Sequence, residues 1–338
     1  MSSRRKFINN SLVSLLGLSL SNSILQNNLF AKEVTSQKKI KISLQCFSFA
    51  SELLYGKMSI LDFPKLVRNE FYLDAAEYWN IPFVSKIRDK NFIQDFNQRT
   101  NDYSLKNTLM LVDLINIKTG SSLSLCSKDK KERGVAIEKH KEWLDFSKSI
   151  GCSSIRVNLW SNNMTMDEVT KYSIESLSKL LEYSEKIDMS IVIENHGGYT
   201  ADAFWLVKLI KSINHKKLGV LPDFGSNNFC IEKPAKKEGE LLNSNDCINQ
   251  FDKYLGVKEL LPYAKGISAK SISFDKSGAE KNTDFERMIK LIKSSSFEGH
   301  IAIEYEGGFM NTIQKNSSNY LSNIEGVHAT KKLIERFI

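Results

Sequence analysis

Residues 190–198 read SIVIENHGG, and this stretch decides the fold class. Residues 191–193 are apolar on both faces of a strand, which is typical of a parallel strand covered by helices on both sides. The apolar run stops at Glu194, where an Asn-His-Gly-Gly loop begins. The stretch therefore indicates a buried parallel strand that carries a carboxylate at its carboxyl end.

Seven other short apolar runs can be read in the same way. Together the eight runs cover residues 40–47, 71–77, 108–115, 154–159, 190–195, 217–223, 264–270 and 300–306. Apolar residues recur at helical spacing between them, at 60–69, 135–150, 166–187, 201–213 and 285–294. Strands that alternate with helices imply parallel strands joined by crossovers. Eight such units predict a single α/β domain over residues 40–338, a (β/α)8 TIM barrel.

An open, doubly wound sheet is the alternative arrangement. No G-x-G-x-x-G follows the first strand, which argues against the dinucleotide-binding form of that fold. Residues 225–256 are polar and rich in Gly and Asn, and we interpret them as an insertion after the sixth strand that lies over the barrel mouth. Residues 327–338 predict a closing helix.

The composition is that of an ordinary globular protein. Of 338 residues, 41% are hydrophobic and 25% are charged, which excludes a disordered chain, a collagen-like chain and a polytopic membrane protein. The formal net charge is +8, but Arg4, Arg5 and Lys6 lie in a leader without acids, and later basic clusters are interrupted by acids. This charge pattern predicts no nucleic-acid partner.

Residues 1–31 predict a twin-arginine-like signal peptide, followed by a linker at 32–39. Arg4-Arg5-Lys6-Phe7-Ile8 resembles the twin-arginine export motif, and the small residue Ala31 marks a candidate cleavage point. The apolar stretch at 12–20 is too short for a membrane span, so we expect no stable membrane insertion of the mature chain. The expected location is the periplasm. A Sec signal or an uncleaved anchor is the alternative.

Five cysteines are widely spaced and form no C-x-x-C pair. They are Cys46, Cys126, Cys152, Cys230 and Cys247. This spacing predicts neither a disulfide framework nor a zinc ribbon. We expect most of them to be small buried apolar residues.

Three of the last four apolar runs end in a carboxylate and the other in a lysine. In chain order these residues are Glu194, Asp223, Lys270 and Glu304. The carboxyl ends of barrel strands form one face, where catalytic groups of such barrels lie. Carboxylates that meet in a low-dielectric mouth repel one another, and a divalent cation such as Mg²⁺ or Mn²⁺ relieves that repulsion. The alternative is that each acid caps a helix or pairs with a nearby base.

Four motifs surround these strand ends: IENHGG at 193–198, PDFG at 222–225, AKGISAKS at 264–271 and IEYEG at 303–307. They resemble the xylose isomerase-like TIM-barrel superfamily, and within it the exported sugar phosphate isomerase/epimerase-type proteins of bacteria. The resemblance implies one divalent ion (Mn, Mg, Co or Zn) held by Glu194, Asp223 and Glu304. Relatives have His-x-Lys in the seventh strand, and here Ser268 occupies the histidine position. The fourth ligand would then be water, His196 or none.

The resemblance implies a metal-dependent sugar isomerase or epimerase that moves a proton next to a carbonyl through an enediolate. Glu194 and Glu304 would serve as the acid and the base. Lys270 would donate to a developing oxyanion, or alternatively would form a salt bridge with a ligand carboxylate. The alternatives are a lyase that eliminates a leaving group from 3-keto-glycosides and a sugar-binding barrel without turnover. A barrel endonuclease with a histidine-rich zinc cluster is excluded, because only five histidines are present.

The expected partner is a small carbohydrate without phosphate, since no Lys/Arg cluster at a strand end suggests a phosphate clamp. Candidate substrate-binding residues are His196, Asn158, Glu306 and Trp160. Gln45, Glu77, Trp79 and Asp113 lie near the ends of earlier strands and are further candidates for the pocket wall.

Overall fold

The computed structural model describes residues 40–116, 119–161, 164–234, 246–313 and 320–338. The expected leader at 1–31 and the expected linker at 32–39 lie outside the described residues.

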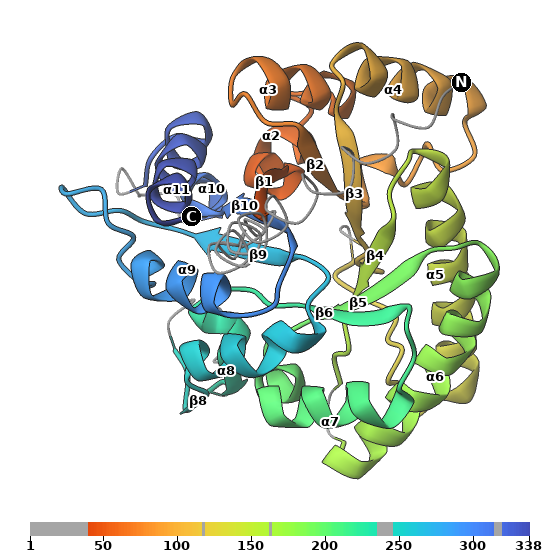
Figure 1. Ribbon diagram of the computed structural model, residues 1–338. Coiled ribbons are helices and arrows are strands. Elements are labelled where there is room, and N and C mark those ends of the chain that lie inside the picture. Colours follow the sequence, from red (N-terminus) through yellow and green to blue (C-terminus); the bar gives the residue numbers. More distant parts are fainter. Residues whose placement is uncertain (1–39, 117–118, 162–163, 235–245, 314–319) are drawn as a thin grey trace, which may run out of the picture. The chain divides into compact units, whose positions relative to one another are not determined.

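Eight parallel strands form a nearly closed barrel, as the sequence predicted (Figure 1). Their hydrogen-bonded order is β6-β5-β4-β3-β2-β1-β10-β9. Isolated bridges from Val220 to Ala264 and from Asp223 to Ser268 join the two ends of this sheet, so the open-sheet alternative is wrong. The barrel strands are β1 (Ile40–Gln45), β2 (Ala75–Trp79), β3 (Lys106–Leu111), β4 (Ser154–Val157), β5 (Ser190–Glu194), β6 (Leu218–Leu221), β9 (Ile267–Ser271) and β10 (Gly299–Tyr305).

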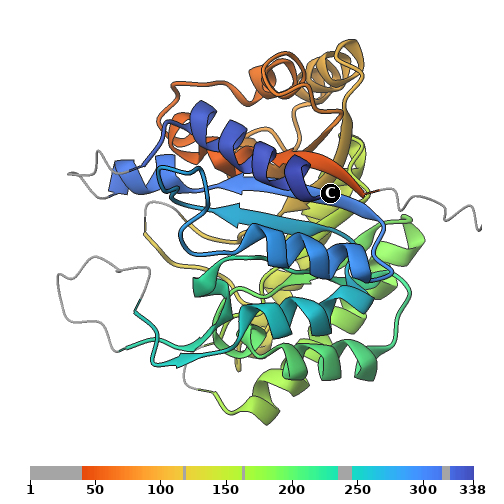
Figure 2. The ribbon, with the colours of Figure 1, turned by 60° about the vertical axis from the view of Figure 1, so that its left-hand side comes forward.

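Helices surround the barrel on its outside (Figures 1 and 2). The helices that follow the barrel strands in turn are α3 (Phe63–Asn69), α4 (Lys90–Asp102), α5 (Lys130–Ser149), α6 (Met166–Lys186), α7 (Ala203–Ile213), α8 (Lys253–Leu260), α9 (Phe285–Ser294) and α11 (Asn323–Phe337). The other described helices are α2 (Ala50–Leu54), α10 (Gly307–Ile313) and the 3-10 helices η1 (Cys46–Phe49), η2 (Ile60–Asp62), η3 (Ile81–Phe83), η4 (Gly198–Ala201), η5 (Ser226–Phe229) and η6 (Leu261–Tyr263). Within the described part of the chain, no helix combines the length and the apolarity that crossing a membrane requires.

All five predicted internal helices are present, and two long helices were missed. Helix α4 buries only Phe96 and Thr100, so few apolar residues mark it in the sequence. Helix α8 begins inside the stretch at 225–256 that we interpreted as a polar insertion and ends beyond it. The second strand starts at Ala75 rather than at 71, because Tyr72 has a φ of 53°, which no strand accommodates.

Aromatic rings fix β2 against its helices. The ring of Tyr78 contacts those of Phe63, Phe83 and Phe96 edge-on, with centroids 5.8, 5.9 and 5.3 Å apart. All four side chains are fully buried. Removing one such ring from a core costs about 3–5 kcal/mol of stability. This packing holds the end of β2, and with it the site residue Trp79, in place.

The segment after β6 folds back on itself beside the barrel. Strands β7 (Cys230–Glu232) and β8 (Asn249–Gln250) pair antiparallel, and residues 235–245 between them lie outside the described residues. Cys230 and Cys247 form a disulfide, so the expectation of no disulfide is wrong for this pair. The two cysteines meet only because the insertion turns back, which spacing does not reveal. Cys46, Cys126 and Cys152 are free and buried, as expected.

Candidate functional site

Three carboxylates meet where β5, β6 and β10 end. Glu194 is the last residue of β5, Asp223 follows β6 by two residues, and Glu304 is next to last in β10. One oxygen from each lies within 4.8 Å of those from the other two, and all three side chains are buried. We call these residues the acidic triad.

The acidic triad fits a divalent cation. Two oxygens that each lie 2.0–2.6 Å from one ion are at most about 5.2 Å apart, and the triad satisfies that limit. Oε2 of Glu194 and Oδ2 of Asp223 are buried and accept no hydrogen bond of normal geometry. Among the described residues no histidine joins this group, so the protein's ligands would all be oxygens. Such a donor set suits Mg²⁺, Mn²⁺ or a similar hard ion.

Burial makes the acidic triad hard to ionise. It raises the pKa of Glu194 to about 7, that of Asp223 to about 6 and that of Glu304 to about 8. Repulsion among the carboxylates adds to the effect of burial, whereas the nearby cationic side chains oppose it. A bound cation would favour the ionised forms of all three.

Lys270 of β9 lies against the acidic triad. Its ammonium is 3.3 Å from Asp223 Oδ2, 3.5 Å from Glu304 Oε2 and 3.0 Å from Glu306 Oε1. Burial opposes its charge, but these carboxylates outweigh burial and raise the pKa of Lys270 well above its ordinary value. The salt bridge that we considered as an alternative is therefore present, and Lys270 remains protonated.

Ser268 stands on β9 at the position that we matched to a histidine in the sequence analysis. Its hydroxyl donates a hydrogen bond of 2.6 Å to Glu304 Oε2. Ser268 and Lys270 lie two residues apart on β9, so both side chains project from the same face of the strand. Here the hydroxyl orients one acid of the triad.

Arg156 of β4 is a site residue that our sequence analysis missed. Its Nε lies 2.8 Å from Glu194 Oε2, and its Nη1 pairs with Asp113 Oδ1. Asn158 Nδ2 donates to that same Asp113 oxygen at 2.8 Å. The alternation of side chains along a strand could have identified Arg156. Residues 156 and 158 lie on the same face, and Asn158 was already a candidate for the site. Asn228, from the insertion, also contacts the triad by donating to Glu194 Oε1 at 3.2 Å.

A cavity of about 530 Å³ opens above the acidic triad, and we call it the acid-lined cavity. The substrate-binding candidates His196, Asn158, Glu306 and Trp160 all line it. Of these, Trp160 is 38% exposed and presents an aromatic surface to the cavity. Arg156, His140, Trp79 and Asp113 also line the cavity.

Gln45 and Glu77 do not line the acid-lined cavity, so their proposed place in its wall is wrong. Both are buried, and Gln45 Nε2 donates to Glu77 Oε2 at 3.2 Å. Ser43 Oγ donates to the other oxygen of Glu77 at 3.1 Å. Burial raises the pKa of Glu77 to about 8. The two residues therefore belong to the interior of the barrel.

The comparisons with known proteins agree with this architecture. The family described as xylose isomerase-like TIM barrel matches residues 73–324. Among proteins of curated function, no sequence match was found.

Solved structures of the same fold include two sugar epimerases and a protein with a bound zinc atom. An L-ribulose 3-epimerase is 13% identical with a TM-score of 0.63, covering 88% of this chain and 94% of its own. An IolI protein with a bound zinc atom is 12% identical with a TM-score of 0.61, covering 88% and 99%. The 3-keto-D-glucoside 4-epimerase YcjR from E. coli is 13% identical with a TM-score of 0.59, covering 88% and 98%. At such identities these similarities establish the fold.

Proposed function

The protein belongs to the xylose isomerase-like TIM-barrel family, and from this premise we propose that it is a metal-dependent sugar isomerase or epimerase. The substrate would be a small carbohydrate without phosphate. The observation that carries the proposal is the convergence of three buried carboxylates within 4.8 Å of one another, two of which, Glu194 and Glu304, line a cavity of about 530 Å³. The epimerases among the solved structures of this fold support it.

The acidic triad would hold the ion, and a divalent cation there would supply positive charge that stabilises an oxyanion next to the reacting carbon. Glu194 and Glu304 reach the cavity from β5 and β10. One carboxylate would remove the proton beside the substrate carbonyl, and the other would return a proton to the opposite face or to the neighbouring carbon. In the metal-free protein their pKa values are raised to about 7 and about 8, and a bound cation would lower both, so that each carboxylate could accept a proton near neutral pH.

Two cationic side chains would assist these acids. Lys270 is protonated and lines the cavity, so it would donate a hydrogen bond to a substrate oxygen that gains negative charge. Arg156 holds Glu194 by an ion pair and thereby orients one of the two acids. The positive charges of Lys270 and Arg156 offset part of the negative charge of the triad. The cavity would therefore accept an uncharged sugar.

The remaining polar wall would bind hydroxyl groups. Asn158, His196 and Glu306 line the cavity and can donate to or accept from a sugar. Trp160 would cover one face of the ring, as aromatic side chains do with apolar surfaces.

The proposal is tested with the native chain, by measuring bound divalent metal and then incubating it with free sugars and 3-keto-glycosides in deuterated water. Deuterium that enters a sugar without bond cleavage is the expected result. Release of the aglycone would instead assign the protein as a lyase. Retained sugar binding with neither exchange nor release would assign it as a non-catalytic sugar-binding barrel.

We also propose that the protein is exported to the periplasm through its twin-arginine-like leader. The disulfide between Cys230 and Cys247 supports this proposal, because stable disulfides are rare in the cytosol. Replacing Arg4 and Arg5 by lysine should retain the protein in the cytoplasm, as measured by cell fractionation. Unchanged export of this variant would favour the Sec route.

A further inference from the structure

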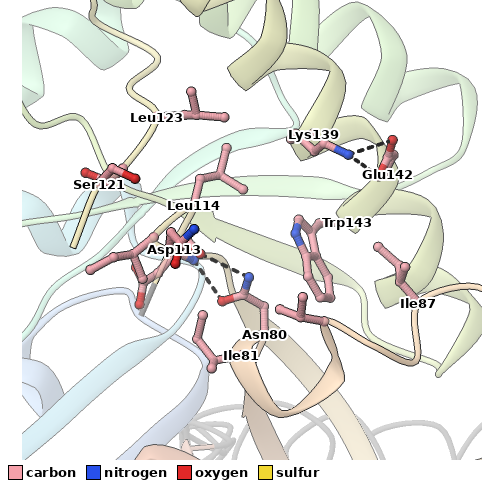
Figure 3. Close-up of a pocket in the computed structure, with 14 residues that line it drawn as sticks. Asn80, Ile81, Ile87, Asp113, Leu114, Ser121, Leu123, Lys139, Glu142 and Trp143 are labelled. Carbon is pink, nitrogen blue, oxygen red and sulfur yellow. Dashed lines mark hydrogen bonds and ion pairs between the residues drawn. The ribbon is translucent and has the colours of Figure 1, made fainter. Parts of the chain in front are cut away.

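A second cavity adjoins the acid-lined cavity, and we call it the apolar cavity (Figure 3). Its volume is about 790 Å³. Ile81, Val84 and Ile87 contribute one wall from the segment after β2, Leu114 and Leu123 contribute another from the segment after β3, and Trp143 of α5 forms part of the lining. The segments after strands carry the side chains that vary ligand preference in barrels of this kind.

The two cavities share part of their lining. Asp113, Leu114, Ile115, Ser122 and Leu123 line both of them. Asp113 links the two sides, because its carboxylate is held by Arg156 and Asn158 of the acid-lined cavity. Its backbone N–H donates to Asn80 Oδ1 at 2.9 Å, and its carbonyl accepts from Asn80 Nδ2 at 3.1 Å. A molecule bound over the acidic triad can therefore extend past Leu114 into the apolar cavity.

Few polar groups in the apolar cavity are available to a ligand. Lys139 and Glu142 pair with each other at 3.0 Å (Figure 3). The indole of Trp143 points its ring nitrogen toward the side of Leu114, as Figure 3 shows. The cavity thus combines the apolar side chains of its lining with polar groups that include the indole N–H of Trp143.

Two apolar side chains of this cavity are unusually exposed. Val84 is 55% exposed and Ile115 is 40% exposed. Exposed apolar residues that gather in a concave surface mark a place where an apolar ligand removes them from water. Because this surface continues from the site of the proposed chemistry, the rest of the same substrate is the occupant that the arrangement favours.

We propose that the apolar cavity binds the aglycone of a glycoside whose sugar ring lies over the acidic triad. This inference rests on the proposed function and narrows its substrate class to glycosides that carry a carbonyl on the sugar ring, such as 3-keto-glycosides, and an aromatic or otherwise apolar aglycone. The Trp143 indole would donate a hydrogen bond to an acceptor on that aglycone.

The test compares a matched pair of probes, methyl glucoside and phenyl glucoside, by calorimetric titration of the full chain loaded with Mn²⁺. Neither probe carries the carbonyl that the proposed chemistry needs, so binding is measured without turnover. We expect phenyl glucoside to bind about tenfold more tightly, as burial of one ring predicts. In the Val84→Asp variant the ratio of the two affinities should fall toward one.

A matched control uses another exposed valine. Val135 lies on α5, is 43% exposed and lines neither cavity, so Val135→Asp should keep the native ratio. Trp143→Phe should reduce the preference for p-nitrophenyl glucoside over phenyl glucoside, since it removes the indole N–H and retains an aromatic ring.

The outcomes separate this inference from the proposed function. Equal affinities of native protein for the two probes, or a phenyl preference that survives Val84→Asp, would overturn the aglycone site while leaving the sugar site standing. Binding of neither probe would count against the proposed function and against this inference with it. A dimer that Val84→Asp dissociates would assign the cavity to a second copy of the chain and overturn the inference.

Discussion

The two cavities at the barrel mouth differ in the elements that supply their side chains. The acid-lined cavity takes Glu194, Lys270 and Glu304 from strands, where ladder hydrogen bonds fix the backbone. The apolar cavity takes Ile81, Val84 and Ile87 from the segment between β2 and α4. Charged groups that must keep fixed distances are best placed on rigid elements. A surface that selects among substrates can lie on connecting segments, which tolerate changes of sequence without disturbing the barrel.

From this difference we expect substitutions in the acid-lined cavity to lower catalytic activity and stability. Substitutions in the apolar cavity should instead change which substrates bind. Four measurements test this division, beginning with the largest expected effect.

Glu304→Gln should remove most of the chemistry. The substitution keeps the shape of the side chain but removes a negative charge of the acidic triad and a proton acceptor. We expect the rate of solvent-deuterium exchange into the sugar to fall about 10²–10⁴-fold. Glu298→Gln changes an exposed carboxylate before β10 and should keep the native rate. A native exchange rate for Glu304→Gln would remove this residue from the mechanism.

Lys270→Met should destabilise the metal-free protein by about 3–5 kcal/mol, because it leaves buried carboxylates without their cationic partner. Urea unfolding in the presence of a chelator measures this loss. Added Mn²⁺ should recover part of it by replacing the missing positive charge. Lys276→Met removes an exposed lysine on the segment after β9 and should change stability by less than about 0.5 kcal/mol. Equal losses in the two variants would mean that Lys270 does not balance the triad.

The stability of the metal-free protein should fall as the pH rises from 6 to 8. The folded protein holds protons on Asp223, Glu194 and Glu304 with pKa values of about 6, 7 and 8, above those of the unfolded chain. The stability that these protons contribute at low pH is therefore lost as the pH rises through those values, at up to about 1.4 kcal/mol per pH unit for each proton. Urea unfolding at several pH values, with chelator, measures the slope.

Saturating Mn²⁺ provides the control for that slope. The bound ion should abolish or reverse the contribution of the acidic triad to the slope of stability against pH, because the ion competes with protons for the same oxygens. Glu77, with a pKa of about 8, should also contribute to the slope of stability against pH. This contribution should remain when Mn²⁺ is bound and should disappear in the Glu77→Gln variant. Identical slopes with and without the ion would contradict a metal site at the triad.

Val84→Asp should have the smallest effect on folding. Val84 is more than half exposed, so we expect its replacement to change the free energy of unfolding by less than about 0.5 kcal/mol. Chemical denaturation would measure this change beside that of Lys270→Met. A loss of several kcal/mol would show that this wall belongs to the packed core rather than to a ligand surface.

The order of strands and helices, and the identity of the acids at the mouth, were determined by the sequence alone. Apolar runs that stop at Glu194, Asp223 and Glu304 specify where buried strands end, and parallel strands in a barrel end on one face. The helix at 90–102 escaped prediction because it buries only two residues, and Tyr72 shifted the start of the second strand through its backbone angle.

Only the tertiary structure decided which side chains meet. Arg156 forms an ion pair with Glu194, Ser268 donates a hydrogen bond to Glu304, and Cys230 forms a disulfide with Cys247. The spacing of these residues along the sequence does not predict which of them pair. The apolar cavity likewise arises where the segments after β2 and β3 lie beside α5. The physical reason is that local sequence specifies backbone conformation and burial, whereas contacts between distant residues depend on how the barrel closes and on which strands become neighbours.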